Sequence, residues 1–245
     1  MTTTITTTKT KKQRLSVSEC FYSIQGEGQT MGIPAVFLRL GGCNLLCESA
    51  NWRCDTIEVW RKSRSIEFHN VLNEEMLYAL GNGAHLVITG GEPLMHELHI
   101  IEFIKWFMEK YEYKPCIEIE TNGTIIPNAI LNMYVDYWNV SPKLSTAGEQ
   151  NSEELRINKT ALAMFNRFSK NIIFKFVISC EDDLVEMQEK FGIYIDSENI
   201  VLMPAGSSQD ELMKTRQMVA QMCKENYYKY SERLHVVIWN LKTGV

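Results

Sequence analysis

The sequence predicts a single α/β domain built on a parallel sheet, either open or curled into a partial barrel. Segments of strand composition alternate with segments of helical spacing along most of the 245 residues. Polar and cysteine-containing clusters follow the ends of the predicted strands. Ligands of parallel α/β proteins gather at the carboxyl ends of the strands, so the pattern predicts a binding edge as well as a fold.

The predicted strands are rich in β-branched and aromatic residues, and the predicted helices carry apolar residues three and four positions apart. We expect strands at Val17–Ile24, Ala35–Leu40, Leu86–Ile88, Cys116–Glu120, Tyr137–Val140, Ile172–Ile178, Ile200–Met203 and Leu234–Trp239. We expect helices at Val71–Leu80, around Ile100–Met108, and at Ile126–Met133, Ser152–Phe168, Glu181–Lys190 and Gln209–Lys224.

The first residues, Met1–Arg14, form a Thr/Lys-rich segment with little apolar content. Such a segment buries too little surface to offset the entropy of ordering it, so we expect a disordered tail over residues 1–14. A basic anchoring arm is the alternative. No repeat or linker interrupts residues 15–245, which we expect to form one domain.

The bulk composition is that of an ordinary globular protein, with 45% hydrophobic and 22% charged residues. The net charge of -5 argues against direct nucleic-acid binding, which needs a surplus of Lys and Arg. We find no apolar run of membrane-span length and no signal peptide at the threonine-rich start. We therefore expect a cytoplasmic protein that does not associate with membranes.

Three of the seven cysteines, Cys43, Cys47 and Cys54, fall in one loop after the strand Ala35–Leu40. Three thiolates are one too few for a closed structural zinc site, but they suit an iron–sulfur cluster that keeps one iron open. A zinc site with a remote fourth ligand and three unrelated thiols are the alternatives. The other cysteines are isolated, as is typical of small buried hydrophobes in a reducing compartment.

Two further features suggest binding sites. Arg39 stands alone in an apolar strand, where a charged side chain requires a counter-charge. The glycine-containing turns Gln25–Gly28 and Gly90–Pro93 allow the backbone to approach a ligand closely.

Six segments then occur in a specific order: Phe21–Gly28 with Gly32, Gly42–Leu45, Cys54–Thr56, Thr89–Leu94, Glu118–Gly123 and Ser141–Lys143. With these segments the chain from about Ser18 to Val245 resembles the radical S-adenosylmethionine (radical SAM) enzymes and, among them, the 7-carboxy-7-deazaguanine synthase family. One departure stands out. The superfamily usually has two residues between its second and third cysteines, whereas here Glu48–Arg53 separates them.

The resemblance implies a partial, modified (β/α) barrel of the radical SAM type and the activity of the family. That activity is a lyase reaction, in which 6-carboxy-5,6,7,8-tetrahydropterin becomes 7-carboxy-7-deazaguanine with loss of ammonia, in the biosynthesis of queuosine or related 7-deazapurines. It also implies a 4Fe-4S cluster, S-adenosylmethionine, Mg²⁺, an electron donor such as flavodoxin or ferredoxin, and a homodimer.

The resemblance also implies roles for individual residues. The cluster ligands are Cys43, Cys47 and Cys54, and the magnesium ligand is Thr56. The cofactor contacts are Arg53, Cys54, Asp55, Gly91, Ser141, Pro142, Lys143, Met203, Pro204, Ala205 and Gly206. The substrate contacts are Ile24, Gln25, Gly26, Glu27, Arg39, Thr89, His235 and Val245, of which Glu27 and His235 are candidate catalytic residues.

Each role has a structural alternative that the residues alone leave open. Thr56 can be a helix N-cap, Lys143 a solvated surface lysine and His235 a buried strand histidine. For the whole chain the alternatives are an activase that passes a radical to a partner protein, and a cluster-bearing protein without catalysis.

Overall fold

The computed structural model describes residues 13–49, 53–242 and 244, and its centre is an open, mixed sheet with the strand order β3-β1-β2-β4-β5-β6-β7-β8-β9. From β2 onward neighbouring strands run parallel, whereas β1 is antiparallel to both β2 and β3. The strands are β1 (Arg14–Ile24), β2 (Pro34–Leu40), β3 (Arg64–Glu67), β4 (His85–Gly90), β5 (Ile117–Thr121), β6 (Tyr137–Val140), β7 (Ile172–Ile178), β8 (Ile200–Pro204) and β9 (Lys229–Tyr230).

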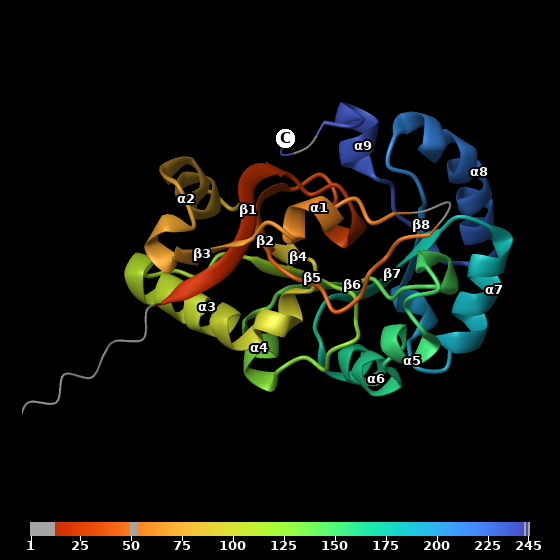
Figure 1. The fold of residues 1–245 in the computed structure, drawn as a ribbon, viewed down its shortest axis with the longest axis horizontal. Helices are drawn as coiled ribbons and strands as arrows, with labels where there is room; N and C mark the ends of the chain where they lie inside the picture. The colour runs from red at the N-terminus through yellow and green to blue at the C-terminus, as the bar shows by residue number, and fades with distance from the viewer. Residues whose placement is uncertain (1–12, 50–52, 243, 245) are drawn as a thin grey trace, which may run out of the picture.

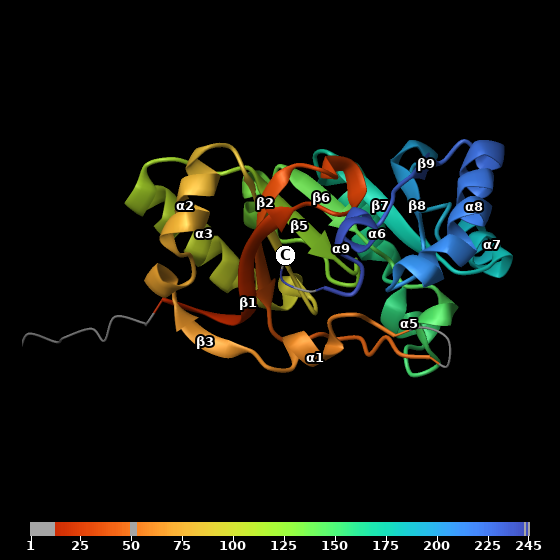
Figure 2. The same cartoon turned by 90° about the horizontal axis from the view of Figure 1, so that it is seen from above.

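Most helices follow one face of this curved sheet, with α3, α4, α6, α7 and α8 along its outer side and α9 across the opposite, concave side (Figures 1 and 2). The α-helices are α1 (Ile57–Trp60), α2 (Glu74–Gly81), α3 (Glu97–Tyr111), α4 (Ala129–Tyr134), α5 (Glu153–Arg156), α6 (Lys159–Phe168), α7 (Glu181–Lys190), α8 (Gln209–Asn226) and α9 (Leu234–Trp239). Short 3₁₀ turns are η1 (Gly28–Thr30), η2 (Phe68–Asn70), η3 (Pro93–His96), η4 (Ser145–Ala147) and η5 (Ser197–Asn199).

The outer face of the sheet holds the main core. One contiguous cluster joins strand residues such as Leu38, Trp138 and Phe174 to helix residues such as Ile104 and Phe165. Successive strand residues point to opposite faces, so the alternate positions of the same strands face the concave side. Several of these alternate positions are polar: Thr89, Glu118, Glu120, Asn139 and Lys175. The concave side of the sheet therefore carries polar and charged side chains, whereas the outer side carries the apolar core.

Most predicted elements are confirmed. β6, β7 and α7 have the predicted bounds, and β2, β4, β5, β8 and α8 differ from prediction at their ends only. The sheet is not wholly parallel, because β1 reverses direction against β2 and the unpredicted β3 joins it as an antiparallel edge strand. Arg14, assigned to the tail, begins β1 and pairs with Glu67 of β3; the tail residues 1–12 lie outside the described residues.

The predicted strand Leu234–Trp239 is wrong, because this segment forms helix α9. Its β-branched residues favour a strand, but β9 already pairs with β8 at that edge of the sheet. The backbone N–H groups of Val236 and Val237 both bond the Arg233 carbonyl, and Asn240 ends the helix at a φ of 55°. His235 is consequently a helix residue and not a strand residue.

The single helix predicted over Ser152–Phe168 is divided into α5 and α6. Ile157 leaves the helical region, and the Asn158 side chain accepts a hydrogen bond from the Ala161 N–H at 3.0 Å. Asn158 is therefore the N-cap of a new helix. Within the described residues no helix is long and apolar enough to cross a lipid bilayer.

Candidate active site

The loops that follow the parallel strands β2, β4, β5, β6 and β8 share one edge of the sheet, as predicted. They pack closely there: a Cβ atom placed on Gly91 would lie 2.1 Å from the Gly42 carbonyl oxygen and 2.7 Å from the Cys43 Cβ. Only a glycine lets the turn after β4 approach the cysteine loop so closely. The residues after Trp239 do not join this edge by following a strand, because Leu234–Trp239 is a helix.

The cysteine loop brings its three thiols together. Cys43, Cys47 and Cys54 are free thiols that contact the same small apolar cluster as Leu45 and Ala147. The Cys54 N–H donates to the Cys47 carbonyl at 2.8 Å, and Glu48 and Arg53 form an antiparallel bridge one step further out. Glu48 and Arg53, with Cys47 and Cys54, thus form the hairpin-like base of the longer segment between the second and third cysteines. That base keeps the second and third cysteines adjacent despite their longer spacing.

A second loop holds the cysteine loop in place. The buried Asn151 side chain accepts from the Leu46 N–H at 3.0 Å and donates to the Leu46 carbonyl at 2.8 Å, which mimics the pairing of a strand. From the end of β5, Asn122 donates to Asn44 Oδ1 at 2.9 Å. Asn122 belongs to the segment Glu118–Gly123 that the sequence singled out, whereas Asn151 was not predicted, because no local pattern marks it.

The chemistry of this loop fits an iron–sulfur cluster. Burial raises the pKa of the Cys43 thiol to about 11 and also raises that of Cys47, so the thiols hold protons that a metal would replace. Within the described residues no three His, Cys, Asp or Glu side chains converge on the position of a single ion. A 4Fe-4S cluster does not require such convergence, because each thiolate binds a different iron.

Thr56 and Arg53 take different positions around the same loop. Thr56 is the N-cap of α1, but its side chain makes no capping hydrogen bond and lies 3.3 Å from the Cys54 Sγ. The Arg53 side chain is half exposed and pairs with Glu48 at 3.0 Å and Glu58 at 2.6 Å. The described contacts of Arg53 therefore lie within its own loop and the helix α1 that follows it.

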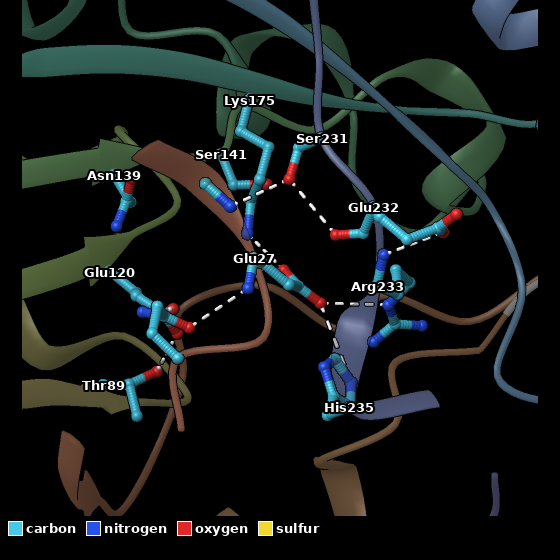
Figure 3. Close-up of polar contacts among 12 residues, drawn as sticks. Glu27, Thr89, Glu120, Asn139, Ser141, Lys175, Ser231, Glu232, Arg233 and His235 are labelled. Atoms are coloured by element: carbon cyan, nitrogen blue, oxygen red, sulfur yellow. Dashed lines mark hydrogen bonds and ion pairs between the residues drawn. The ribbon is translucent and has the colours of Figure 1, made fainter. Parts of the chain in front are cut away.

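On the concave side, Glu27 is the centre of a cluster of cations (Figure 3). Its carboxylate pairs with the Lys175 ammonium and with the Arg233 Nε at 2.9 Å, and His235 Nε2 lies 3.9 Å away. Burial alone would raise the pKa of Glu27, but Lys175 and Arg233 outweigh it and hold that pKa well below its usual range. Burial lowers the pKa of His235, which favours the neutral imidazole.

The turn before Glu27 is fixed by buried polar groups. Gln25 donates to Glu118 at 2.8 Å and to Glu120 at 3.1 Å, and Thr89 donates to the other oxygen of Glu120 at 2.9 Å. Glu120 thereby connects two predicted substrate residues from different strands. A Cβ on Gly26 would lie 2.2 Å from His235 Nδ1, so a glycine is required beside α9. Ile24 is the last residue of β1.

Arg39 has the counter-charge that its burial demands. Its Nε lies 2.7 Å from Glu19 Oε1 on the neighbouring strand β1, and its guanidinium also helps to lower the pKa of Asp55. In the register of β2 and β4, Arg39 stands beside Thr89. Two more of the predicted substrate residues are therefore neighbours.

The predicted cofactor segments after β6 and β8 also meet. Pro142 and Lys143 line one small cavity together with Ala205. The Lys143 ammonium donates to the Ser141 carbonyl at 2.9 Å and to its Oγ at 3.1 Å, so the lysine is bound to its own segment rather than simply solvated. Met203 and Pro204 end strand β8, and Gly206 follows with its carbonyl directed at Arg233.

Lys175 and Arg233 are site residues that the sequence interpretation missed. Lys175 is the only charged residue in the apolar strand Ile172–Ile178. Like Arg39, it therefore requires a counter-charge, and the sequence could have revealed it as a candidate site residue. Arg233 precedes an apolar segment and carries no such signal. Val245, a predicted substrate contact, lies outside the described residues.

A separate cleft of about 470 Å³ lies at the opposite edge of the sheet, at the amino ends of β7 and β8. Its walls include Asn171, Asp196, Glu198 and Lys229. Gly28, at the end of the Gln25–Gly28 turn, also lines it, but none of the described residues predicted to contact cluster, cofactor, magnesium or substrate does.

Comparisons with known proteins agree with this geometry. A family model described as a 4Fe-4S single cluster domain matches residues 24–157. The 7-carboxy-7-deazaguanine synthase of Halobacterium salinarum is 32% identical over 92% of this chain and 91% of its own length, and that of Pyrobaculum aerophilum is 32% identical over 94% and 97%. A crystal structure of QueE from Escherichia coli shares the fold, with a TM-score of 0.64 and 24% identity over 91% of this chain and 97% of the other.

The fold and the site define a radical SAM enzyme with a single 4Fe-4S cluster on a partial barrel. Full-length similarity narrows the class further. The chain belongs to the 7-carboxy-7-deazaguanine synthase family.

Proposed function

We propose that this protein converts 6-carboxy-5,6,7,8-tetrahydropterin into 7-carboxy-7-deazaguanine with loss of ammonia, as a radical SAM lyase of 7-deazapurine biosynthesis. One observation supports the assignment most strongly. The cysteine loop and the Glu27 turn are joined directly, because Arg233 bonds Glu27 at 2.9 Å and Asp55 at 2.5 Å. A cluster-binding loop and a polar substrate turn thus border the same space.

The cluster is bound, in this proposal, by Cys43, Cys47 and Cys54, whose thiols gather around Ala147. When bound, the cluster and S-adenosylmethionine supply a carbon-centred radical that removes a hydrogen atom from the substrate. The contribution of the protein is to orient the two molecules and to exclude solvent from them.

S-adenosylmethionine is held by segments that border the cysteine loop. These are Arg53–Asp55, Gly91, Ser141–Lys143 and Met203–Gly206. The close approach of Gly91 to Cys43 and the shared cavity of Lys143 and Ala205 support a continuous site formed by these segments.

The pterin lies on the concave side between the Glu27 turn and Arg39. Its amidine edge offers N–H donors that suit the ionised Glu27, and its carboxylate suits the guanidinium of Arg39. Ile24, Gln25, Gly26 and Thr89 complete the pocket with backbone and amide groups. His235, neutral and 3.9 Å from Glu27, is placed to exchange a proton with the substrate.

Magnesium is held by the Thr56 hydroxyl and by substrate oxygens. The Thr56 side chain makes no capping hydrogen bond, so its hydroxyl oxygen is available as a ligand to a hard cation such as Mg²⁺. Val245, a predicted substrate contact, lies outside the described residues. We further propose a homodimer that receives electrons from a small carrier such as flavodoxin or ferredoxin.

A product assay tests this function. The protein is reconstituted anaerobically with iron and sulfide, reduced with dithionite and supplied with S-adenosylmethionine, Mg²⁺ and the carboxytetrahydropterin. We expect 7-carboxy-7-deazaguanine by mass spectrometry. Deoxyadenosine without the deazaguanine would favour the activase alternative, and a full cluster with neither product would favour the non-catalytic one.

A further inference from the structure

Arg233 contacts three segments that the proposed function assigns to different ligands. Its Nε donates to Glu27 of the substrate turn, and its Nη1 donates to the Gly206 carbonyl after β8 at 2.6 Å. Its Nη2 donates to Asp55 of the cysteine loop at 2.5 Å. All three nitrogens of one planar guanidinium are therefore engaged, each by a different part of the site.

The segment that carries Arg233 is bound to the substrate turn by its backbone as well. The Gly28 N–H donates to the Ser231 hydroxyl at 2.8 Å, and the Leu234 N–H donates to the Gly26 carbonyl at 2.8 Å. Figure 3 shows the side chains of Ser231, Arg233 and His235 converging on the turn. The turn and residues 231–235 consequently form one unit, and the Arg233 side chain connects this unit to the cofactor segments.

The charges and burial at this point favour a fixed arrangement. The side chains of Arg233 and Glu27 are 12% and 15% exposed, whereas that of Asp55 is 47% exposed. Asp55 follows Cys54 and precedes Thr56, so a displacement of Arg233 would be transmitted to residues beside the cluster.

Lys175 provides a comparison. It pairs with the same carboxylate from β7, yet within the described residues its ammonium bonds neither Asp55 nor Gly206. Lys175 can influence Glu27 but cannot connect Glu27 to the cofactor segments.

We propose that Arg233 is a positioning residue that couples the binding of the pterin to the binding of S-adenosylmethionine. The coupling rests on the proposed function of the two sites. Either ligand, by holding its own segment against the guanidinium, stabilises the three-way contact that the other ligand requires. Because coupling between two sites is reciprocal, each ligand must tighten the other by the same factor.

Anaerobic titration calorimetry of the reconstituted enzyme tests this proposal. The cluster is left oxidised so that no turnover occurs, and the Kd of S-adenosylmethionine is measured with and without saturating carboxytetrahydropterin. In the native enzyme we expect a ratio of the two values of roughly 5- to 100-fold, the usual range for coupled sites. In Arg233→Gln and Arg233→Lys we expect the ratio to approach one, because neither side chain has the planar group of three separate nitrogens that reaches Glu27, Gly206 and Asp55 at once.

Two further variants separate coupling from simple binding. Asp55→Asn removes the charge of one of the three groups that bond Arg233, so the ratio of the two Kd values should fall. This variant provides a test even if the Arg233 variants fail to fold. Lys175→Met should weaken pterin binding but leave the ratio unchanged. Arg167→Gln, on the exposed surface of α6, is the matched control and should leave both Kd values and the iron content unchanged.

A native ratio of one, with product formed normally, would overturn the coupling and leave the proposed function intact. An unchanged ratio in the Arg233 variants with a full cluster would also overturn it. No pterin binding together with no product would instead overturn the proposed function and this inference with it.

Discussion

The cysteine loop follows the carboxyl end of β2, whereas the Glu27 turn follows β1 at the amino end of β2, and Arg233 connects the two. The chain builds these two regions differently. The three thiols come from one short loop, and a local hairpin base brings the last two together. The Glu27 cluster takes its side chains from the β1–β2 connection, from β7 and from the segment before α9. The first site depends on spacing along the chain. The second depends on topology, so each should respond differently to mutation.

Removal of one thiol should have the largest effect. Cys54→Ala leaves two cysteines, which cannot hold the cluster, so we expect loss of both iron and turnover. Iron analysis and the absorbance of the reconstituted protein give the measurement. Cys180→Ala, an isolated cysteine before α7, is the control and should retain both. Turnover by Cys54→Ala would refute the assignment of this ligand.

Removal of the charge on Glu27 should affect the Glu27 cluster, whose residues are far apart in the sequence, and should leave the iron–sulfur cluster in place. Glu27→Gln leaves Lys175 and Arg233 without their shared counter-charge, which should cost about 3 kcal/mol of stability. Loss of a charge-assisted substrate contact should also lower kcat/KM roughly 10- to 100-fold. Thermal unfolding and steady-state kinetics measure the two effects.

The double variant Glu27→Gln/Lys175→Met sharpens this test. It should regain part of the lost stability, because one unpaired buried cation is removed, without regaining activity. Iron content should stay at the native value throughout. Loss of the cluster in Glu27→Gln would show that the two regions are not separable in this way.

Loosening the cysteine loop from outside should have an intermediate effect. Asn151→Leu removes both of its hydrogen bonds to Leu46, although Gln150 still donates to the Leu46 carbonyl. The lost bonds should cost about 1 kcal/mol of stability. We expect faster loss of iron to a chelator. Asn128→Leu removes the N-cap of α4, a comparable loss of stability far from the loop, and should release iron at the native rate. Equal rates in the two variants would contradict the role of Asn151.

The support of the substrate turn should depend on pH. Hydrogen bonds to Cys116 and Glu118 raise the pKa of the buried His85 to about 9, and Glu118 in turn accepts from Gln25. A raised pKa stabilises the folded state fully below the ordinary value of 6.5, and this contribution is lost as the pH rises through about 9. Tm should fall over this interval, and His85→Gln should flatten the fall. An identical slope in the variant would refute the contribution of His85.

The smallest effect is expected at the hairpin base. Arg53 pairs with Glu48 and Glu58 at half-exposed positions, and such surface pairs contribute little to stability. Arg53→Gln should therefore change Tm little. If the side chain also contacts S-adenosylmethionine, as proposed, the Kd of the cofactor should rise several-fold while that of the pterin does not. An unchanged Kd would remove Arg53 from the cofactor site.

Sequence patterns predicted the elements of this fold well where local and global preferences agree. β7 is an apolar run that pairs on both sides, and its bounds were predicted correctly. Leu234–Trp239 has the same β-branched character, but the edge of β8 was already occupied by β9, and only the tertiary structure reveals this. The reversal of β1 was equally hidden, because a strand's composition does not encode its direction.

The same distinction holds for the candidate site. The cysteines and the glycine turns are local signals. The structure gathers the three thiols in one cluster and packs Gly91 against their loop. Arg233 and Asn151 act on residues far away in the chain, through hydrogen bonds that no spacing rule describes. Lys175 could have been predicted from the sequence, because a single lysine in a buried strand needs a counter-charge, as Arg39 does.

A crystal structure of the anaerobic enzyme with S-adenosylmethionine and the carboxytetrahydropterin would test the central claim most directly. The central claim is that the polar concave side, and not the larger cleft at the opposite edge, receives the substrate. We predict pterin density between Glu27 and Arg39, with a Glu27 oxygen within hydrogen-bonding distance of a ring N–H. Pterin density in the cleft formed by Asn171, Asp196 and Lys229 would contradict it.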